Sequence, residues 1–296
     1  MILIPAHAKV NLCLAVRGRR ADGFHDIDSV ALTIDWHDLV GIRLRPAPST
    51  SVRLRVTGVD GSAPPGDDNL VALAARAVAA VVGPLAADLW LDKSIPAAAG
   101  LGGGSSDAAG VLRGCASLLG AGSLGRGRDM LDRLTLFALA ASLGSDVPML
   151  VAGGAQRMRG RGELLTPVEA PALHLVVAVV GASSTAATYA AVESFDLEDG
   201  SRTDAVCAAL EAGRTPAADL LGSGLEEAAC RANPALGERL LALRAGLPEA
   251  RWHLTGSGGA AFAVVDGAPG AAELAATAVT AGYPARACRA MPDPLG

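Results

Sequence analysis

The segment that most constrains the fold is a glycine-rich stretch between an expected strand and an expected helix. IPAAAGLGGGSSDAAG follows a strand that we expect over residues 88–93, and a helical pattern runs from Ser105 to about Leu119. Small residues at this place let the backbone curl and direct several N–H groups to one point, at the positive end of the helix. A flexible linker is the alternative, but linkers do not usually start a helix with Ser-Ser-Asp. The pattern therefore predicts a site for a phosphate group.

This glycine-rich stretch matches neither of the two common nucleotide-binding fingerprints. No lysine follows the glycines as in G-x-x-x-x-G-K-[ST], and no acidic residue ends a following βαβ strand as in a dinucleotide site. The remaining interpretation is a triphosphate-binding site that uses neither of these two fingerprints.

The composition is that of a packed globular protein with no surface for polyanions. Of 296 residues, 51% are hydrophobic and 19% are charged, and the formal net charge is -5. These values exclude a disordered chain and disfavour nucleic acid or an anionic membrane as a partner. No apolar run reaches membrane-spanning length. The five cysteines are scattered without a C-x-x-C pair, so we expect reduced thiols and a cytoplasmic protein.

Lysine is the rarest charged residue type in the chain. Only Lys9 and Lys93 are lysines among 25 basic residues, which indicates a drift from lysine to arginine wherever either residue serves. A lysine is a compact point charge that can lie close to a phosphate or be partly buried. Lys9 lies in an apolar strand pattern, where an ordinary solvent-facing residue is the alternative. Its rarity favours a functional role.

A second candidate group is the carboxylate of Asp146 in the turn Gly144–Pro148. An aspartate in such a turn is more often a helix N-cap than a catalytic residue. Transfer of a phosphoryl group to an alcohol, however, needs a group that orients or deprotonates the hydroxyl and a cation that stabilises the developing charge. Lys9 and Asp146 together would supply both.

Two further turns carry residues suited to binding. Phe24 and His25 follow an arginine-rich turn, and an exposed aromatic ring beside an imidazole can stack on a planar base and form hydrogen bonds with it. A small local core is the alternative for this pair. Residues 255–259 form a second glycine-rich loop that either lies near the substrate or the phosphates or is only a hairpin.

The strands and helices are segregated along the chain, which favours an α+β fold over a doubly wound sheet. We expect strands over 2–4, 10–16, 29–34, 39–44, 52–56, 88–93, 156–158, 163–167, 174–180, 251–254, 260–265 and 284–289. We expect helices over 69–82, capped by Asp67 or Asp68, and over 105–119, 129–142, 201–212, 223–231, 235–245 and 270–281, with a linker at 58–68. A domain boundary is expected between about residues 150 and 172.

Six motifs in order resemble those of the GHMP small-molecule kinases. They are A-K-[IVL]-N-L at 8–12, D-G-[YF]-H at 22–25, the phosphate loop at 96–107, G-[AS]-D-V-P at 144–148, G-x-G-E-x-L-x-P at 160–167 and [TS]-G-[TS]-G at 255–258. The first two are most similar to those of the members that act on a cytidyl-linked substrate.

The resemblance implies a two-domain α+β GHMP kinase fold. Its N-terminal domain, over 1–160, would be similar to domain 2 of ribosomal protein S5 and would carry the phosphate loop and the catalytic residues, and its ferredoxin-like C-terminal domain would cover 161–296. The implied activity is ATP-dependent phosphorylation of the 2-hydroxyl of 4-diphosphocytidyl-2-C-methyl-D-erythritol, in the non-mevalonate route to isoprenoid precursors, with Mg²⁺ on the phosphates. The resemblance implies that the protein binds this small-molecule substrate as its partner. It also implies a monomer or a weak homodimer. A homoserine-type or mevalonate-type kinase, or a non-catalytic nucleotide-binding relative, is the alternative.

The resemblance also implies roles for individual residues. Lys9 and Asp146 would be catalytic, with Asp146 orienting or deprotonating the hydroxyl and Lys9 holding it in place. The residues that would bind ATP are Lys93, Pro96, Ala97, Ala98, Ala99, Gly100, Leu101, Gly102, Gly103, Gly104, Ser105 and Ser106. The residues that would bind the substrate are Asn11, Phe24, His25, Asp146, Thr185, Tyr189 and Gly256. Phe24 and Tyr189 would stack on the cytosine, and His25 would read its polar edge.

Overall fold

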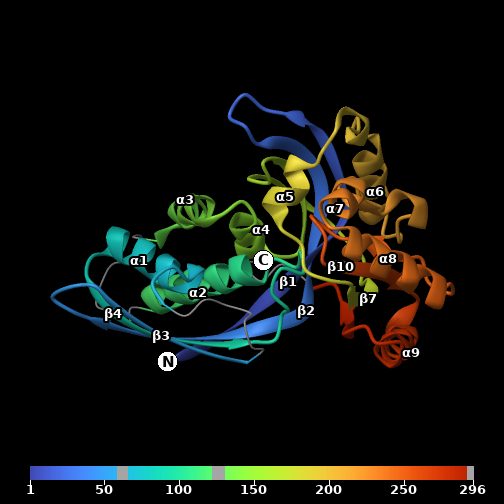
Figure 1. Ribbon diagram of the computed structural model, residues 1–296. Helices are drawn as coiled ribbons and strands as arrows, with labels where there is room; N and C mark the ends of the chain where they lie inside the picture. The colour runs from blue at the N-terminus through green and yellow to red at the C-terminus, as the bar shows by residue number, and fades with distance from the viewer. Residues whose placement is uncertain (59–65, 122–130, 292–296) are drawn as a thin grey trace. The chain divides into compact units, whose positions relative to one another are not determined.

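The computed structural model describes residues 1–58, 66–121 and 131–291 (Figure 1). The chain divides into two compact units that alternate along the sequence. The first unit comprises Met1–Ala8, His37–Ala97 and Gly102–Ala152, and the second comprises Lys9–Trp36, Ala98–Leu101 and Gly153–Gly296. Strands β1 (Ile2–Arg19) and β2 (His25–Pro46) therefore contribute residues to both units. The domain boundary at residue 160 stays a prediction.

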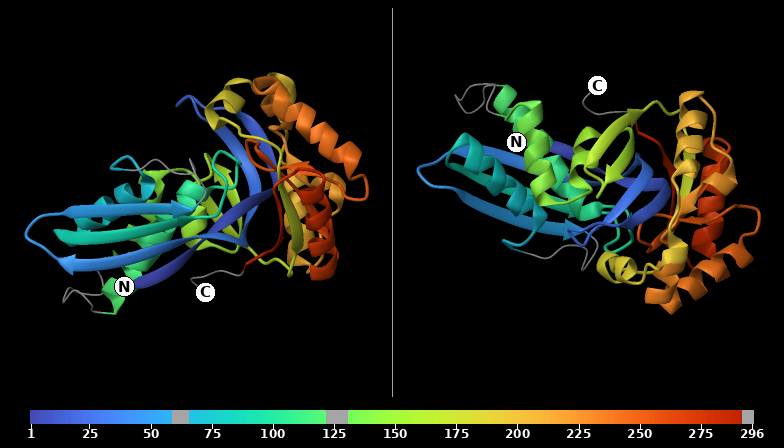
Figure 2. Two further views of the ribbon diagram at one scale, coloured as in Figure 1. Left: turned by 60° about the horizontal axis from the view of Figure 1, so that its bottom comes forward. Right: turned by 90° about the horizontal axis from the view of Figure 1, so that it is seen from above.

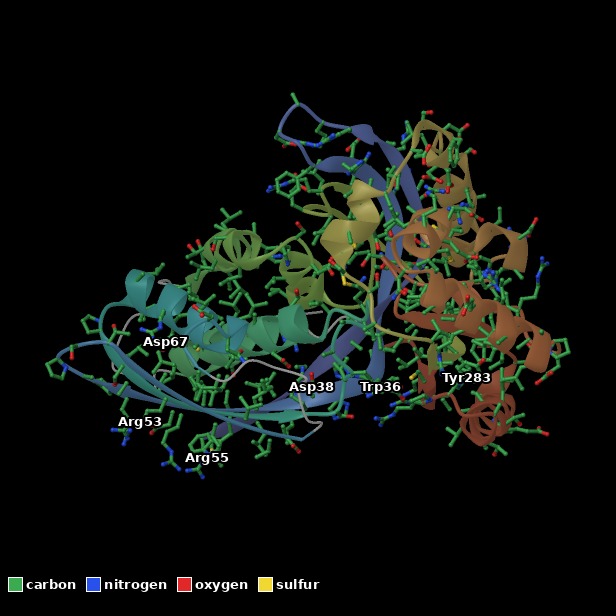
Figure 3. The ribbon with its side chains drawn as sticks, viewed as in Figure 1. Trp36, Asp38, Arg53, Arg55, Asp67 and Tyr283 are labelled. Carbon is green, nitrogen blue, oxygen red and sulfur yellow. The ribbon has the colours of Figure 1, made fainter. Side chains whose placement is uncertain are left out.

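The first unit is a sheet with helices on one face. Strand β3 (Ser51–Gly58) pairs in parallel with β4 (Leu85–Lys93), and β4 pairs antiparallel with residues 39–46 of β2. The helices are α1 (Leu70–Val82), α2 (Gly103–Gly120), α3 (Arg133–Leu143) and α4 (Val147–Ala152), and they pack on one another. Figure 3 shows Arg53 and Arg55 of β3 pointing away from these helices, as expected for alternate residues of a strand with one open face.

Helix α1 begins one residue later than expected and has a different cap. The side chain of Asn69 accepts a hydrogen bond from the Val71 N–H at 2.9 Å, so Asn69 is the N-cap and the prediction of Asp67 or Asp68 is wrong. The helix ends at Gly83, whose φ of 89° no ordinary residue adopts easily, directly before Pro84.

The second unit contains a four-stranded antiparallel sheet in the order β11-β7-β10-β9. Its strands are β7 (His174–Val179), β9 (His253–Leu254), β10 (Ala260–Val265) and β11 (Ala285–Arg289). Helices α8 (Pro234–Gly246) and α9 (Gly267–Thr280) lie on one face of this sheet (Figure 2). Leucines of α8 and alanines of α9 bury their side chains against Val176 and Ala261, so this face holds the core of the sheet.

Shorter elements complete the second unit. Strands β5 (Ala155–Gly160) and β6 (Leu164–Val168) form the expected hairpin, which pairs with residues 27–32 of β2. Strand β8 (Gly222–Ser223) pairs in parallel with β1. The remaining helices are α5 (Thr185–Ala190), α6 (Ser201–Glu211), α7 (Glu226–Ala232) and two 3-10 turns at Ser194–Asp196 and Ala218–Leu220.

The α+β class is confirmed, and the differences from expectation concern continuity. The strands expected over 2–4 and 10–16 are one strand, as are those over 29–34 and 39–44, because polar residues interrupt the apolar pattern without interrupting the backbone pairing. The expected turn Gly144–Pro148 is only partly correct, since Val147 and Pro148 begin helix α4. Helix α5 was not predicted. Parts of the expected linker, 59–65, and of the helix expected from 129 lie outside the described residues.

All five cysteines are free, and none of the helices in the described part of the chain is long and apolar enough to cross a membrane.

Helix α2 lies close to its sheet because two of its glycines face the strands. A Cβ atom at Gly110 would lie 3.3 Å from Cγ2 of Val40. A Cβ atom at Gly114, four residues later, would overlap with the Ile42 side chain and would lie 3.0 Å from Cγ1 of Ile4. The close approach therefore depends on the absence of side chains at these positions.

Replacing Gly114 by alanine should lower the free energy of unfolding by about 1–3 kcal/mol, because the added methyl group overpacks this contact. The higher helix propensity of alanine acts in the opposite direction and is smaller. Gly120→Ala is the matched control, since a Cβ there meets nothing within 4 Å, and it should leave the free energy unchanged or raise it by up to about 1 kcal/mol. Urea denaturation measures both, and equal changes in the two variants would contradict the close approach.

Candidate active site

Lys93, the last residue of β4, belongs to a buried ion cluster at the start of the phosphate loop. Its ammonium donates hydrogen bonds to Asp38 on β2 and to Oδ2 of Asp107 on α2, the latter at 2.8 Å. The three side chains are 1%, 0% and 2% exposed. The second carboxylate oxygen of Asp38 accepts from the N–H groups of Ser94 and Ile95 at 2.5 and 2.8 Å. The cluster therefore holds both the first residues of the loop and the first turns of the helix that follows it.

The protonation of this cluster follows from its burial. Removal from water raises the pKa of Asp107 to about 8, with Lys93 acting to lower it and Asp38 to raise it. Burial therefore favours the neutral form of Asp107, and a neutral Asp107 leaves the Lys93 ammonium and the Asp38 carboxylate as a charge-balanced pair. Since the ammonium of Lys93 is held by two carboxyl groups, its expected contact with the nucleotide stays a prediction.

The middle of the phosphate loop packs backbone to backbone on the late glycine-rich loop 255–259. A Cβ at Gly259 would lie 2.5 Å from the carbonyl oxygen of Ala98, and a Cβ at Gly100 would lie 3.1 Å from that of Thr255. Both glycines have positive φ, and Ala98 itself has a φ of 54°. The Ser183 N–H donates to the Ala98 carbonyl at 2.9 Å. The late loop, which connects β9 and β10, is therefore both a hairpin and a support for the phosphate loop.

Helix α2 begins at Gly103, two residues before the expected start, with Gly102 as an N-cap in the left-handed region. Its first-turn N–H groups have no partners within the helix, and they lie at the positive end of an 18-residue helix. The hydroxyl of Ser106 donates to the His7 carbonyl at 2.6 Å and is buried, whereas Ser105 is half-buried. This geometry suits an anion, as the sequence predicts.

Lys9 lies in a buried polar network on β1. Its ammonium donates to Oδ1 of Asn11 at 2.6 Å, and Asn11 Nδ2 donates to the hydroxyl of Ser29 at 2.8 Å. The Asn11 N–H donates to the Thr255 hydroxyl at 2.8 Å. A Cβ at Gly256 would lie 3.1 Å from both Lys9 Nζ and Asn11 Oδ1, so only glycine leaves room for these groups. The structure thus brings together three expected site residues, Lys9, Asn11 and Gly256.

Asp146 is half-buried and directly precedes helix α4, where its carbonyl accepts from the Leu150 N–H at 3.2 Å. A Cβ at Gly144 would lie 4.0 Å from the hydroxyl of Ser105, so this turn lies beside the start of α2. Lys9 belongs to the second unit and Asp146 to the first, and their joint action stays a prediction.

The expected ring-binding residues all belong to the second unit, and two of them are in contact. The rings of His25 and Tyr189 stack with their centroids 5.2 Å apart and their planes at 26°. Phe24 is 50% exposed, and the guanidinium of Arg161 lies 4.7 Å from its ring centroid. Burial and the charge of Arg19 lower the pKa of His25, so its neutral imidazole has one donor and one acceptor for hydrogen bonds. Phe24 directly precedes His25 in the chain, and we call Phe24, His25 and Tyr189 the ring group. Such side chains are suited to a planar base with a polar edge.

Thr185, the remaining expected substrate residue, contacts the late loop through its hydroxyl, 2.8 Å from that of Ser257. Four residues with roles in the site were not predicted: Asp38, Asp107, Ser29 and Arg161. The sequence contains a signal for Asp38 and Asp107, because a lysine in an apolar strand, such as Lys93, needs a buried carboxylate as its partner. None existed for Ser29 and Arg161, whose contacts depend on strand pairing.

Comparisons with known proteins identify the family of the chain. Residues 69–154 match the family model described as GHMP kinases N terminal domain. The 4-diphosphocytidyl-2-C-methyl-D-erythritol kinase of Xanthobacter autotrophicus is 38% identical over 291 residues, which cover 91% of this chain and 92% of that protein. The protein of the same name from Bradyrhizobium sp. is also 38% identical over 291 residues, which cover 94% of this chain and 92% of the relative.

Solved structures show the same relationship. A crystal structure of a 4-(cytidine 5'-diphospho)-2C-methyl-D-erythritol kinase is 33% identical, with a TM-score of 0.79 and coverage of 97% of this chain and 98% of that one. The homoserine kinase of Cytophaga hutchinsonii is 14% identical with a TM-score of 0.66, covers 98% of this chain and 95% of its own, and shares the fold. The chain therefore belongs to the 4-diphosphocytidyl-2-C-methyl-D-erythritol kinase family of GHMP kinases, with their two-domain fold of an S5 domain 2-like and a ferredoxin-like part.

Proposed function

We propose that this chain transfers the γ-phosphoryl group of ATP to the 2-hydroxyl of 4-diphosphocytidyl-2-C-methyl-D-erythritol, a step of the non-mevalonate route to isoprenoid precursors. The observation that carries the proposal is the ring group of Phe24, His25 and Tyr189. The alcohol substrate of a homoserine-type or mevalonate-type kinase contains no planar base, so that substrate would not need such rings. The full-length similarity to kinases named for this substrate supports the same reading.

The phosphate loop, residues 96–106, would bind the triphosphate of ATP, the phosphate donor of GHMP kinases. The backbone N–H groups of Gly103 and Gly104 and the hydroxyl of Ser105 are the donors at the start of α2. Backbone donors suit this role because they are fixed before the ligand arrives and cost no reorganisation during the reaction. Lys93 acts from inside the protein by fixing the ends of the loop.

Asp146 and Lys9 would perform the transfer. The carboxylate of Asp146 orients the substrate hydroxyl and takes its proton as the oxygen attacks the γ-phosphorus and the bond to ADP breaks. The ammonium of Lys9 holds that oxygen and stabilises the negative charge that develops. Because Lys9 is only 6% exposed and bound to Asn11, its charge is fixed in place and weakly screened by water.

Mg²⁺ is part of the proposal. In the described part of the chain no group of three or more His, Cys, Asp or Glu side chains could hold a metal ion. This suits Mg²⁺ bound with ATP, which takes most of its ligands from phosphates and water and only one or two from the protein. The hydroxyl oxygen of Ser105 is the ligand from this chain that would hold it. When bound, Mg²⁺ would neutralise charge on the phosphates.

The proposal also includes the cellular compartment and the oligomeric state of the enzyme. The five free thiols suit a reducing compartment, and we place the enzyme in the cytoplasm. We expect a monomer or a weak homodimer, which sedimentation at several protein concentrations measures.

Purified protein with Mg²⁺ and ATP should phosphorylate the cytidyl substrate, with one ADP released per product, because the site provides a base, a cation and a phosphate loop. Coupled ADP detection and phosphorus NMR of the product measure this. Asp146→Asn should lower kcat by about 10²–10⁴-fold, the usual contribution of a general base. Homoserine and mevalonate are the comparison alcohols. Turnover of either with none of the cytidyl substrate would overturn the proposal, and no turnover at all would favour a non-catalytic relative.

Loss of the Phe24 ring should weaken binding of the cytidyl substrate without affecting ATP. Phe24→Leu should raise KM for the cytidyl substrate about tenfold or more, because stacking on a base contributes about 1–3 kcal/mol, and should leave KM for ATP within about twofold. Phe195→Leu is the matched control, since Phe195 is also exposed, at 68%, with the guanidinium of Arg231 5.1 Å from its ring centroid. Steady-state kinetics measure both, and an unchanged KM in Phe24→Leu contradicts the base-binding role.

Removal of the ammonium from the buried ion cluster should destabilise the protein strongly. Lys93→Met leaves the Asp38 carboxylate buried without a counter-charge and should lower the free energy of unfolding by about 3–5 kcal/mol. Asp107→Asn keeps an oxygen for Lys93 and removes no necessary charge, so it should change the free energy by less than about 1.5 kcal/mol. Urea denaturation measures the two variants, and a Lys93→Met protein as stable as Asp107→Asn would show that the cluster is not required.

A further inference from the structure

We infer that Ser29 is a positioning residue for the phosphoryl transfer, because its hydroxyl fixes the orientation of the Asn11 side-chain amide that holds the ammonium of Lys9. The inference rests on the proposed function in one respect only, the role of Lys9 at the reacting oxygen. Ser29 itself belongs to none of the motifs in the sequence and lies near the start of β2.

The three side chains form a chain of hydrogen bonds that is closed to water. Lys9, Asn11 and Ser29 are 6%, 3% and 0% exposed. The distances are 2.6 Å from Lys9 Nζ to Asn11 Oδ1, 2.8 Å from Asn11 Nδ2 to Ser29 Oγ and 2.7 Å from Ser29 Oγ to the carbonyl oxygen of Cys13. Lys9, Asn11 and Cys13 are alternate residues of β1, so one strand supplies both ends of this series of hydrogen bonds.

The groups at the two ends of this hydrogen-bond series, the Cys13 carbonyl and the Lys9 ammonium, fix the donor and the acceptor in every hydrogen bond. The Cys13 carbonyl can only accept, so the single hydroxyl hydrogen of Ser29 is directed to it. The hydroxyl oxygen is then free only to accept, and the group of Asn11 that faces it must be the NH₂. The other end of the amide, Oδ1, is therefore directed to Lys9, which can only donate. The two ends demand the same amide orientation.

The backbone of Asn11 is held separately, so the amide has little freedom other than rotation. The Thr255 hydroxyl accepts from the Asn11 N–H at 2.8 Å and donates to the Asn11 carbonyl at 3.4 Å. Gly256 lies against both the amide oxygen and the Lys9 ammonium. A rotated amide would place its NH₂ group against the Lys9 ammonium, and Oδ1 would then face the Ser29 hydroxyl, whose hydrogen is already directed to the Cys13 carbonyl.

Without the Ser29 hydroxyl, a buried NH₂ group loses its acceptor. The amide can then turn or shift to find another partner, and Lys9 loses a fixed oxygen at 2.6 Å. Since catalysis by a charge depends on its being held in place, the loss should fall on kcat and not on binding of ATP.

Ser29→Ala should lower kcat for the cytidyl substrate about tenfold and leave KM for ATP within about twofold. The matched control is Thr203→Val, which removes a buried hydroxyl that donates to the Asp28 carbonyl at 3.1 Å and accepts from the Cys13 thiol at 3.8 Å. It should leave kcat unchanged. An unchanged kcat in Ser29→Ala overturns the inference. If Ser29→Ala does not fold, Ser29→Cys makes the same comparison, because a thiol is a weak hydrogen-bond acceptor.

A double-mutant cycle separates orientation of the amide from general support of the strand. In Asn11→Asp both side-chain oxygens accept, so no orientation remains to be fixed, and adding Ser29→Ala should change kcat by less than about twofold. An equal loss of kcat in both backgrounds overturns the inference.

Nitrogen NMR gives a readout independent of turnover. The side-chain NH₂ signal of Asn11 is assigned by its loss in Asn11→Asp, and its hydrogens should exchange with water slowly in the wild type and faster in Ser29→Ala. An unchanged exchange rate also overturns it. A wild type without kinase activity contradicts the proposed function instead, and the NMR result then still tests the hydrogen bond.

Discussion

The buried cluster of Lys93, Asp38 and Asp107 is the constraint on which the phosphate loop depends. Charges removed from water are tolerated only when their partners are close and well oriented, so the cluster permits one arrangement of three segments. These segments are the end of β4, the part of β2 that belongs to the first unit, and the first turns of α2. The loop leaves from one member of the cluster and returns to another. Its two ends are thereby fixed before any phosphate is bound.

The middle of the same loop is fixed by a different kind of contact. Ala98 and Gly100 lie against Gly259 and Thr255 with no side chains between the two backbones, and the Lys9 N–H donates to the Leu101 carbonyl at 3.0 Å. Ionic contacts at the ends and backbone contacts in the middle leave little freedom to a segment that is rich in glycine. A glycine-rich sequence is flexible when it is isolated, but here close backbone approach is the reason that glycine is required.

Most of the fold could be predicted because hydrophobic periodicity and turn residues act locally. The hairpin of β5 and β6, the strands of the four-stranded sheet and the long helices agree with the pattern. The errors arise where local chemistry competes with tertiary contacts. Asn69 caps α1 although two aspartates precede it. Strands β1 and β2 continue through polar residues because those residues have buried partners, which the apolar pattern cannot show.

The residues of the candidate site also fall into those that the sequence could predict and those that it could not. Motif residues such as Lys9, Asn11 and Gly256 could be predicted, and they lie together. Ser29 could not, because it is an ordinary strand residue until pairing brings it to a distant partner. Such residues bind nothing themselves. They fix the groups that do, and a single sequence carries no local signal for that role.

The size of the two ammonium sites gives a physical reason for the presence of lysine in a chain otherwise rich in arginine. A Cβ placed at Gly256 would lie 3.1 Å from Lys9 Nζ, and one at Gly103 would lie 3.3 Å from Lys93 Nζ, so each charged group already touches the backbone of a glycine. A guanidinium is broader and carries five N–H donors, which a buried site must satisfy. Both sites are closed to water: the side chain of Lys93 is 1% exposed, and Lys9 is 6% exposed. A broader group at either position would displace the glycine backbone beside it. The rarity of lysine in this sequence therefore marks two positions where the cation must be small because the backbone lies close around it.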